Sequence, residues 1–375
     1  MSRAGSCAGD ADHFGWAQGI RRMAKVDIVV PCYNYGRFLE ACVGSVLRQS
    51  VADLRVLIID DASSDNSLSV ARKLARDDPR VTVVAHERNK GHIGTYNEGI
   101  AWASADYFLL LSADDLLVAG ALERAVEIMD KNPDVVLTHG ECVSWNDDSP
   151  IPNIEPTQDY TWARQDLLEE MCAIATNFVW TPTAIARTST QKAIGGYRAS
   201  LPHSGDMEMW LRFAASGSVA RIDAVQAIYR RHSTAMSNAY FAEIISDYRQ
   251  CQLAFESFFD EYGDRLGTSR DLKGLARHAL AERIFQSGIA LLRRGRLNDG
   301  LRLMREAMAM DRRLRYLPPL WRLLKIPGEG GRQWALSVIR RTPGKLLGWA
   351  SQSPKSQHQP EVDSSHFSSG NHVGH

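Results

Sequence analysis

The sequence has few features of a disulfide-stabilised or zinc-stabilised protein. Its six cysteines form no Cys-x-x-Cys pair, and no Cys/His group has the spacing of metal ligands. In a chain of 375 residues, this usage predicts buried thiols in a reducing compartment. The cysteines are Cys7, Cys32, Cys42, Cys142, Cys172 and Cys251.

Long apolar runs and an excess of one charge are also missing. No stretch approaches the roughly 18 apolar residues of a membrane-spanning helix, and residues 1–24 lack a signal-peptide core. Basic and acidic residues balance at 44 each, which gives no support for nucleic-acid binding. We therefore expect a cytoplasmic protein with a flexible leader over 1–24, in which Met23 is an alternative start to Met1.

Hydrophobic residues make up 44% of the sequence and follow alternating strand and helix patterns. Short β-branched runs predict buried strands, and apolar residues at helical spacing predict the helices between them. This alternation predicts an α/β fold with a doubly wound, mostly parallel sheet flanked by helices. The expected strands are 26–31, 54–61, 80–86, 106–115 and 134–145, and the expected helices are 36–50, 66–77, 94–104 and 119–132.

Polar side chains collect at the carboxyl ends of these strands, where open parallel sheets bind ligands. The first strand ends in "PCYNYG", the second at Asp60 and Asp61, the third before "ERNKG", and the fourth at Asp114 and Asp115. The adjacent pair Asp114 and Asp115 could cap a following helix, lie in a solvated turn, or bind a divalent cation such as Mg²⁺ or Mn²⁺. The position after a buried strand favours the cation site.

Three segments in order, "VDIVVPCYNYGRFLEACVGSVLRQS", "VLIIDDASSDNS" and "LLLSADD", resemble the family 2 glycosyltransferases. The resemblance covers roughly residues 25–235. It implies the GT-A fold and an inverting enzyme that uses a nucleotide sugar. The family's Gln-x-x-Arg-Trp motif of processive members is absent from this sequence, which implies transfer of one sugar.

The resemblance also implies roles for residues at the predicted sheet edge. Pro31 and Tyr33 match the loop around the nucleoside, and Asp60 and Asp61 match the pair that binds base and ribose. Arg88 matches a neighbouring loop, with an ordinary turn as the alternative. For Asp60 and Asp61 the alternative is a cap of the next helix.

Asp114 and Asp115 match the DXD-type motif, with Asp114 on the nucleotide side and Asp115 as the direct metal ligand. His232, in "YRRHSTAMS", matches a loop that closes over the diphosphate, as a further metal ligand or a structural histidine. In the same loop, Arg230 or Arg231 is a candidate for contact with phosphate.

The resemblance places the general base of inversion at the start of a helix, in "SGDMEMWLRF". Asp206 occupies that position, with Glu208 in reserve, and a helix cap is the alternative for Asp206. Trp180 and Trp210 are candidates for stacking on the acceptor sugar, or else core aromatic residues.

The expected organisation is a leader over 1–24, a GT-A domain over 25–240, a helical region over 241–350 and a disordered tail over 351–375. Residues 280–314 predict a helical hairpin similar to one tetratricopeptide unit. Residues 311–345 carry nine basic and two acidic residues, a net charge of +7. This segment could rest on anionic lipid or form a solvated basic face.

The resulting hypothesis is an inverting, metal-assisted, non-processive glycosyltransferase. Its expected donor is a UDP-sugar, its acceptor a saccharide or lipid-linked saccharide, and its setting bacterial cell-surface polysaccharide or glycoconjugate synthesis. It would be cytoplasmic, with peripheral contact at the inner face of the membrane. The alternative is a non-catalytic GT-A-like domain whose helical tail binds a protein partner; a nucleotidyltransferase fits the "PCYNYGRF" loop poorly.

Overall fold

The computed structural model describes residues 25–155, 157, 159–236, 244–267 and 271–316. The predicted leader, the predicted tail and most of the basic segment 311–345 lie outside these residues. None of the helices described is long and apolar enough to cross a membrane.

The first half of the chain alternates strand and helix, as the sequence predicts. Most boundaries lie within about three residues of those expected from periodicity, because each element buries a regular apolar face. The elements are β1 (Val26–Cys32), α1 (Gly36–Leu47), β2 (Leu54–Asp60), α2 (Ser67–Asp77), β3 (Val81–Ala85), α3 (Gly91–Trp102) and β4 (Tyr107–Leu110).

The sheet has nine strands, with β3, β2, β1 and β4 side by side and parallel. Beyond β4 the order continues β8 (Ile185–Arg187), β6 (Val135–Asn146), β9 (Ser218–Arg231), β5 (Leu116–Leu117), and β7 (Thr161–Gln165) also pairs with β9. Strand β8 is antiparallel to both of its neighbours, whereas β6 and β9 are parallel. The sheet is therefore mixed but mostly parallel.

The predicted strand 106–115 is divided in the structure. Strand β4 ends at Leu110, the chain turns with Asp115 N–H donating to Ser112 C=O, and β5 then pairs antiparallel with β9. Helix α4 (Ala121–Lys131) begins only after this strand. Asp114 and Asp115 therefore lie in a connection inside the sheet, and the helix-cap alternative for them is wrong.

The two faces of the sheet bury separate cores. Val26, Ile28 and Val30 of β1 pack with α1 and α4, while Val29 points to the opposite core with α3. This alternation follows from the two-residue period of a strand. The second core also contains α5 (Leu167–Ile174) and α7 (Gly205–Ala214), so helices cover both faces.

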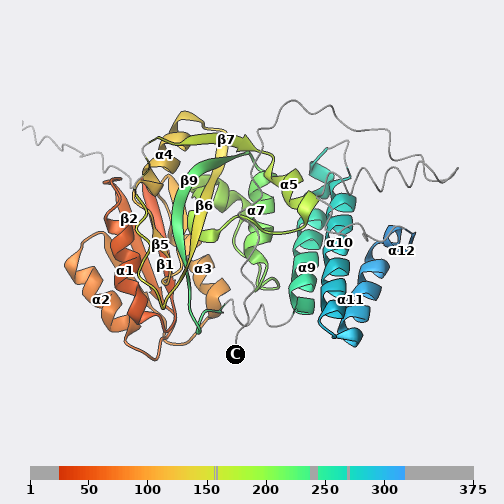
Figure 1. Cartoon of the computed structure of the whole chain (residues 1–375). Helices are drawn as coiled ribbons and strands as arrows, with labels where there is room; N and C mark the ends of the chain where they lie inside the picture. The colour runs from red at the N-terminus through yellow and green to blue at the C-terminus, as the bar shows by residue number, and fades with distance from the viewer. Residues whose placement is uncertain (1–24, 156, 158, 237–243, 268–270, 317–375) are drawn as a thin grey trace, which may run out of the picture. The chain divides into compact units, whose positions relative to one another are not determined.

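The second core continues into the helices that follow the sheet. Helix α7 contacts β6 and β9 on one side and α9 (Ile244–Tyr262) on the other, and α10 (Leu272–Arg293) packs on α5. Figure 1 shows α7 between the sheet and α9. The helical C-terminal extension is thus built onto the sheet through a shared core.

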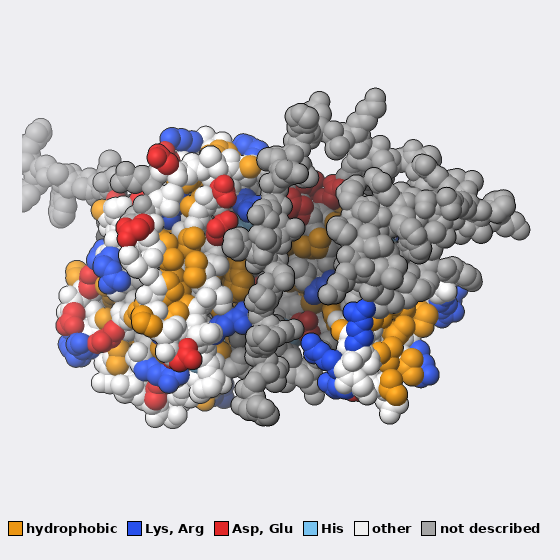
Figure 2. All heavy atoms as spheres, viewed as in Figure 1, with side chains coloured by type: hydrophobic (Ala, Val, Ile, Leu, Met, Phe, Trp, Pro, Cys, Tyr) orange, Lys and Arg blue, Asp and Glu red, His pale blue; other side chains and the backbone are white. Residues whose placement is uncertain are grey.

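Helix α10 and helix α11 (Leu297–Met310) form a hairpin, followed by the short α12 (Arg313–Tyr316). Residues 294–296 connect the two helices, and Gly295 at the centre of this turn has a φ of +78°. Leu297 and Leu301 are 62% and 44% exposed on α11. Figure 2 shows hydrophobic side chains beside basic ones over this part of the molecule.

Candidate functional site

The predicted donor-side residues lie on one edge of the sheet. In the strand register, Cys32 pairs with Asp60, and Asp60 pairs with Ala85, so β1, β2 and β3 end level with one another. From β1 the chain proceeds outward to β2 and β3, and β4 then lies on the other side of β1. The strand order therefore reverses between β1 and β4, where α/β sheets bind ligands.

The loop after β1 is held against the loop after β2 by side-chain hydrogen bonds. Asn34 Oδ1 accepts from Ser64 N–H at 2.8 Å, and Asn34 N–H donates to Ser63 Oγ at 2.9 Å. Asn34 and Ala62 both have φ of +59°, a left-handed conformation that is strained for Ala. Tyr33, in the same loop, is 49% exposed and free to meet a flat ring.

Gly36 shows why these loops approach so closely. A Cβ atom there would lie 2.3 Å from Asn66 Oδ1 and 2.8 Å from Ser67 N. Only glycine permits the starts of α1 and α2 to meet at this distance. The contact fixes the loop that carries Pro31 and Tyr33 beside the loop that carries Asp60.

Asp60 is buried at the end of β2, and only one of its two carboxylate oxygens has a hydrogen-bond partner. Its Oδ2 accepts from Ser63 N–H at 3.2 Å, while its Oδ1 is buried with no hydrogen-bond partner. A buried acceptor without a partner is unfavourable. Because α2 begins only at Ser67, the helix-cap alternative for Asp60 and Asp61 is wrong.

Asp61 is bound to a histidine that the sequence did not single out. Asp61 Oδ1 lies 2.7 Å from His86 Nδ1 and accepts from Lys90 N–H at 2.7 Å. Burial acts to raise the pKa of Asp61, but these hydrogen bonds lower it below its ordinary value. The other ring nitrogen of His86 lies 3.1 Å from Glu98 Oε2, so the ring is held between two carboxylates.

Arg88 lies in the exposed loop between β3 and α3, next to His86 and Lys90 in sequence. Its position beside the nucleotide stays a prediction.

Asp114 and Asp115 are both buried in the connection between β4 and β5. Asp115 Oδ1 accepts from Arg230 N–H at 3.1 Å. Burial and the charge of Asp114 raise the pKa of Asp115 well above its ordinary range. Two adjacent carboxylates are thus buried together, and little positive charge lies against their oxygen atoms.

His232 and Arg230 connect this carboxylate pair to the end of β9. His232 Nε2 lies 3.1 Å from Asp114 Oδ2, and its ring packs against Tyr35 and Phe38. Arg230 Nε donates to the Asp114 C=O at 2.9 Å and its Nη1 donates to Asp147 at 2.6 Å. The Arg230 guanidinium is therefore bound within the protein, where it lies between the rings of Phe38 and Trp145.

The carboxylate pair fits part of a metal site. Among the residues described, no group of three or more His, Cys, Asp and Glu side chains is arranged as a complete one. Mg²⁺ is commonly bound by one or two carboxylates together with substrate phosphates. The burial of Asp114 and Asp115 side by side is the observation that fits a cation, since a nearby positive charge would favour the ionised carboxylates.

Asp206 lies in the first turn of α7. Its Oδ2 accepts from Asn177 Nδ2 at 2.9 Å and its Oδ1 accepts from Met207 N–H at 2.7 Å, and the Thr181 side chain also hydrogen-bonds to it. Burial raises the pKa of Asp206 to about 6, although these hydrogen bonds act in the opposite direction. Ser204 occupies the N-cap position of α7, although its side chain makes no capping hydrogen bond, so Asp206 is not the N-cap residue.

Glu208, the reserve candidate for the base, is engaged elsewhere. It is fully buried, with Oε1 accepting from Arg198 Nε at 2.7 Å and Oε2 from Arg212 Nε at 3.0 Å. Both oxygens are thus occupied by guanidinium groups, which leaves Asp206 as the acid that could take a proton.

The short helix η1 (Thr181–Thr183) lies between the two groups of acids. Thr181 bonds to Asp206, and η1 contacts both β5, which follows Asp115, and β9, which leads to His232. Trp180 precedes η1, is 37% exposed, and lies 5.2 Å from the Tyr229 ring. Trp210, in contrast, is buried beside Phe213, so it is a core aromatic residue.

Sequence reasoning missed His86, Asn177 and Thr181. His86 directly follows β3, which is a weak signal, whereas Asn177 lies in the connection after α5 and Thr181 begins η1. Each meets its acid only through the fold.

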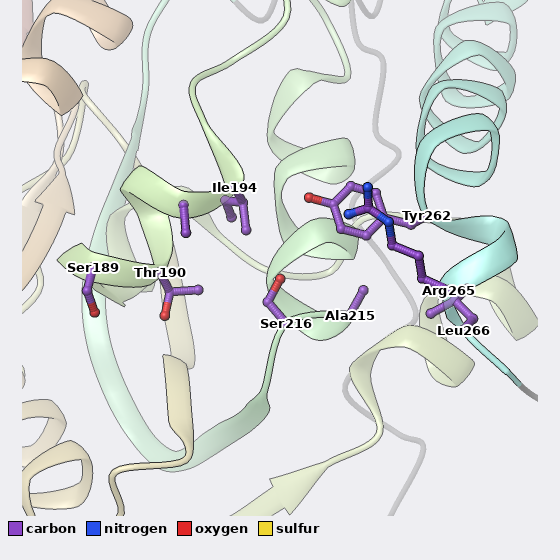
Figure 3. Close-up of a pocket in the computed structure, with 9 residues that line it drawn as sticks. Ser189, Thr190, Ile194, Ala215, Ser216, Tyr262, Arg265 and Leu266 are labelled. Atoms are coloured by element: carbon purple, nitrogen blue, oxygen red, sulfur yellow. The ribbon is translucent and has the colours of Figure 1, made fainter.

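A separate pocket of about 460 Å³ lies away from these residues. Figure 3 shows its lining side chains from α6 (Thr188–Ile194), the end of α7, the end of α9, and the 3-10 turn η2 (Gly263–Arg265). Arg265 lies over the Tyr262 ring at 5.6 Å. None of the predicted site residues lines this pocket.

Comparison with known proteins agrees with this geometry. Residues 27–188 match the family model described as glycosyl transferase family 2. An uncharacterized glycosyltransferase of Nostoc sp. is 33% identical over 124 residues, which are 33% of this chain and 38% of that relative. The chain thus spans well under half the length of this relative.

Two further proteins extend the comparison. The UDP-Glc:alpha-D-GlcNAc-diphosphoundecaprenol beta-1,3-glucosyltransferase WfgD of Escherichia coli is 26% identical over 221 residues, 58% of this chain and 82% of WfgD. The structure of S. aureus TarS 1-349 in complex with UDP-GlcNAc superposes with a TM-score of 0.52 at 16% identity, covering 77% of this chain and 92% of that chain. Residues 27–188 are thus similar to glycosyl transferase family 2, and the chain has the GT-A fold.

Proposed function

We propose that the chain is an inverting glycosyltransferase that moves one sugar from a UDP-sugar to a hydroxyl group of a saccharide acceptor. The observation that carries the proposal is the buried pair Asp114 and Asp115 at the point where the strand order reverses. Such a pair is costly in a protein without a ligand and is relieved by a cation and a nucleoside diphosphate.

The donor would lie along the carboxyl ends of β1, β2 and β4. Tyr33 offers an exposed ring to the base. The unpartnered Oδ1 of Asp60 would accept a hydrogen bond from a base N–H or a ribose hydroxyl, and Asp61 would be kept ionised beside it. A Mn²⁺ or Mg²⁺ ion held by Asp115, with Asp114 and His232 beside it, would neutralise charge on the leaving diphosphate.

The acceptor would be activated by Asp206. Its carboxylate would take the proton of the acceptor hydroxyl as that oxygen bonds to the anomeric carbon. The bond from the anomeric carbon to the diphosphate oxygen breaks at the same time, and its electron pair stays on the diphosphate. A base whose pKa is about 6 is ionised at neutral pH and still takes a proton more readily than an ordinary aspartate.

We further propose a lipid-linked saccharide as the acceptor and peripheral contact with a membrane through residues 311–345. The name of the E. coli relative, which includes diphosphoundecaprenol, supports the first point. The basic charge of the segment supports the second. Sedimentation with anionic liposomes should fall when residues 311–375 are deleted, and unchanged sedimentation would remove the membrane contact from the proposal.

Thermal-shift measurement with UDP, GDP, dTDP and CMP, each with and without Mn²⁺, tests the donor and the metal. A ligand that binds only the folded protein raises the melting temperature by mass action. We expect the largest shift with UDP plus Mn²⁺, and its loss in Asp115→Ala. Asp77→Ala, which removes an exposed acid, is the matched control and should keep the shift.

Asp115→Asn tests metal binding separately from folding, because the amide oxygen of the variant can still accept from Arg230 N–H. This variant should lose the Mn²⁺-dependent part of the shift alone. No shift with any nucleotide, in a protein shown to be folded, would favour the non-catalytic alternative.

A further inference from the structure

Helix α9 is bound by three side-chain bridges to the segment that leads into α7. The Arg198 guanidinium pairs with Glu261, His203 Nε2 lies 3.3 Å from Asp247 Oδ1, and Ser204 Oγ donates to the Gln250 C=O at 2.7 Å. The three α9 partners are spaced so that they share one side of the helix. The C-terminal extension therefore holds the residues immediately before Asp206.

Arg198 lies at the centre of this arrangement because it contacts both helices. Its Nε donates to Glu208 on α7 at 2.7 Å, while its Nη2 donates to Glu261 on α9. Glu208 also binds Arg212, and Arg212 in turn donates to the Ile194 and Gly196 carbonyl oxygens at 2.5 and 2.9 Å. A buried charge network of this kind has well-defined geometry, since each group loses its partners if it moves.

Asp206 and Glu208 belong to the same first turn of α7, so the position of this turn sets the position of both residues. Side chains from two elements also cover Asp206. The titratable groups that face it are Tyr197 and Cys251, and the charge of Asp206 helps raise the pKa of both. Cys251 belongs to α9, so this helix supplies part of the water-excluding environment of the base.

We propose that Arg198 is a positioning residue for the transfer reaction, linking Glu208 on α7 to Glu261 on α9 so that Asp206 stays against Asn177 and Thr181. The inference rests on the proposed role of Asp206 as the base. It gives α9 a function in the chemistry of the sheet domain, in addition to its packing. Arg198 itself need not touch substrate.

The test compares Glu261→Gln with Asp260→Asn in the full-length chain. Both residues lie on α9 and are exposed at their carboxylates, but Asp260 pairs with Lys273 of α10, at 3.2 Å, and with no residue of the α7 side among those the structure describes. For Glu261→Gln we expect kcat to fall about threefold to tenfold with the KM for the donor unchanged, because small displacements of a reacting group cost rate. Asp260→Asn should stay within about twofold of the unchanged chain.

The pH profile distinguishes positioning from simple stabilisation. If α9 loosens, water reaches Asp206, its pKa falls toward the ordinary value, and the acid limb of kcat/KM moves to lower pH. Arg198→Lys keeps the charge but cannot span both carboxylates with a planar fork, so it should lower kcat about tenfold and shift the limb in the same direction.

The measurements distinguish failure of the proposed function from failure of the inference about Arg198. If the unchanged chain transfers no sugar, or Asp206→Asn still does, the proposed function fails and the inference with it. If Asp206→Asn is inactive but Glu261→Gln and Arg198→Lys match Asp260→Asn in kcat and pH profile, the inference alone is overturned. A lower melting temperature without those kinetic changes also overturns the inference, because it shows a purely structural bridge.

Discussion

Asp27 and Asp115 are buried and Asp206 is half-buried, and the groups around each aspartate separate structural from functional acids. Asp27 accepts from Arg55 Nε and Nη2 and from two backbone N–H groups, at Ser104 and Ala105. Asp115 has one backbone donor and a neighbouring like charge. Asp206 has only uncharged donors. A carboxylate that the protein leaves undercompensated is available to a cation or a proton.

Asp206→Asn should abolish transfer while leaving the fold intact. Loss of a general base lowers kcat by about 10²–10⁴-fold, and the donor-induced thermal shift should remain. In the unchanged chain, kcat/KM should rise with pH through about 6, because Asp206 acts as a base only when ionised. An acid limb near pH 4 would contradict the buried environment described for this carboxylate.

The same substitution has a stability signature. Since the folded-state pKa of Asp206 is raised, its favourable contribution to stability is present at low pH and is lost as pH rises through about 6. Asn has no such loss, so Asp206→Asn should melt no lower than the unchanged chain at pH 7. A marked drop in melting temperature would indicate a structural acid instead.

At the scale of elements, the two edges of the sheet have different tasks. The carboxyl edge holds strained loops, an unpartnered Asp60 oxygen and adjacent acids. At the opposite edge, Asp27 of β1 joins Arg55 of β2 to the connection between α3 and β4 through ideal hydrogen bonds. The hydrogen bonds at that edge align the strands. The aligned strands then place Asp60 and Asp114 at the same end of the sheet.

Asp27→Ala should therefore destabilise the protein without altering nucleotide recognition. Removing this acceptor leaves the Ser104 and Ala105 N–H groups without their partner. Such a loss costs about 1–3 kcal/mol, which denaturant unfolding would measure. The nucleotide-induced shift, measured where the variant is still folded, should match that of the unchanged chain. A selective loss of nucleotide binding would show that this edge is coupled to the site.

At the scale of the whole described molecule, the sheet and the C-terminal helices share one core. Phe255, Phe258 and Phe259 of α9 belong to the same buried cluster as Met207 and Leu211 of α7. Residues from such a continuous core unfold together rather than in separate steps. The helical extension is thus expected to contribute to the stability of the domain that carries the site.

Phe258→Ala tests this cooperativity. Phe258 is fully buried, and truncating such a residue costs about 3–5 kcal/mol. Calorimetry should show one transition that moves to lower temperature as a whole, with tryptophan fluorescence and circular dichroism changing together. Two transitions, of which only one moves, would mean that α9 unfolds independently of the sheet.

Local patterns in the sequence determined the alternating strands and helices and the acids at their ends. Apolar periodicity reports which face of each element is buried. Asp60 and Asp61 stand at the end of the second apolar run, and Asp114 and Asp115 stand at the end of the fourth. A family resemblance added Asp206. The short strands β5 and β8 could not be found this way, because two or three residues carry no detectable period.

Only the tertiary structure decided which groups surround each acid. His86 meets Asp61, Asn177 meets Asp206, and Arg198 meets Glu261, although each pair is separated by at least 25 residues in the sequence. Such pairs form when helices pack on the sheet, and no local pattern encodes them. The same packing left one oxygen of Asp60 without a partner and placed Glu208 among guanidinium groups. Residue type and spacing thus set which acids could act, whereas their burial and partners decided the environment in which each one titrates.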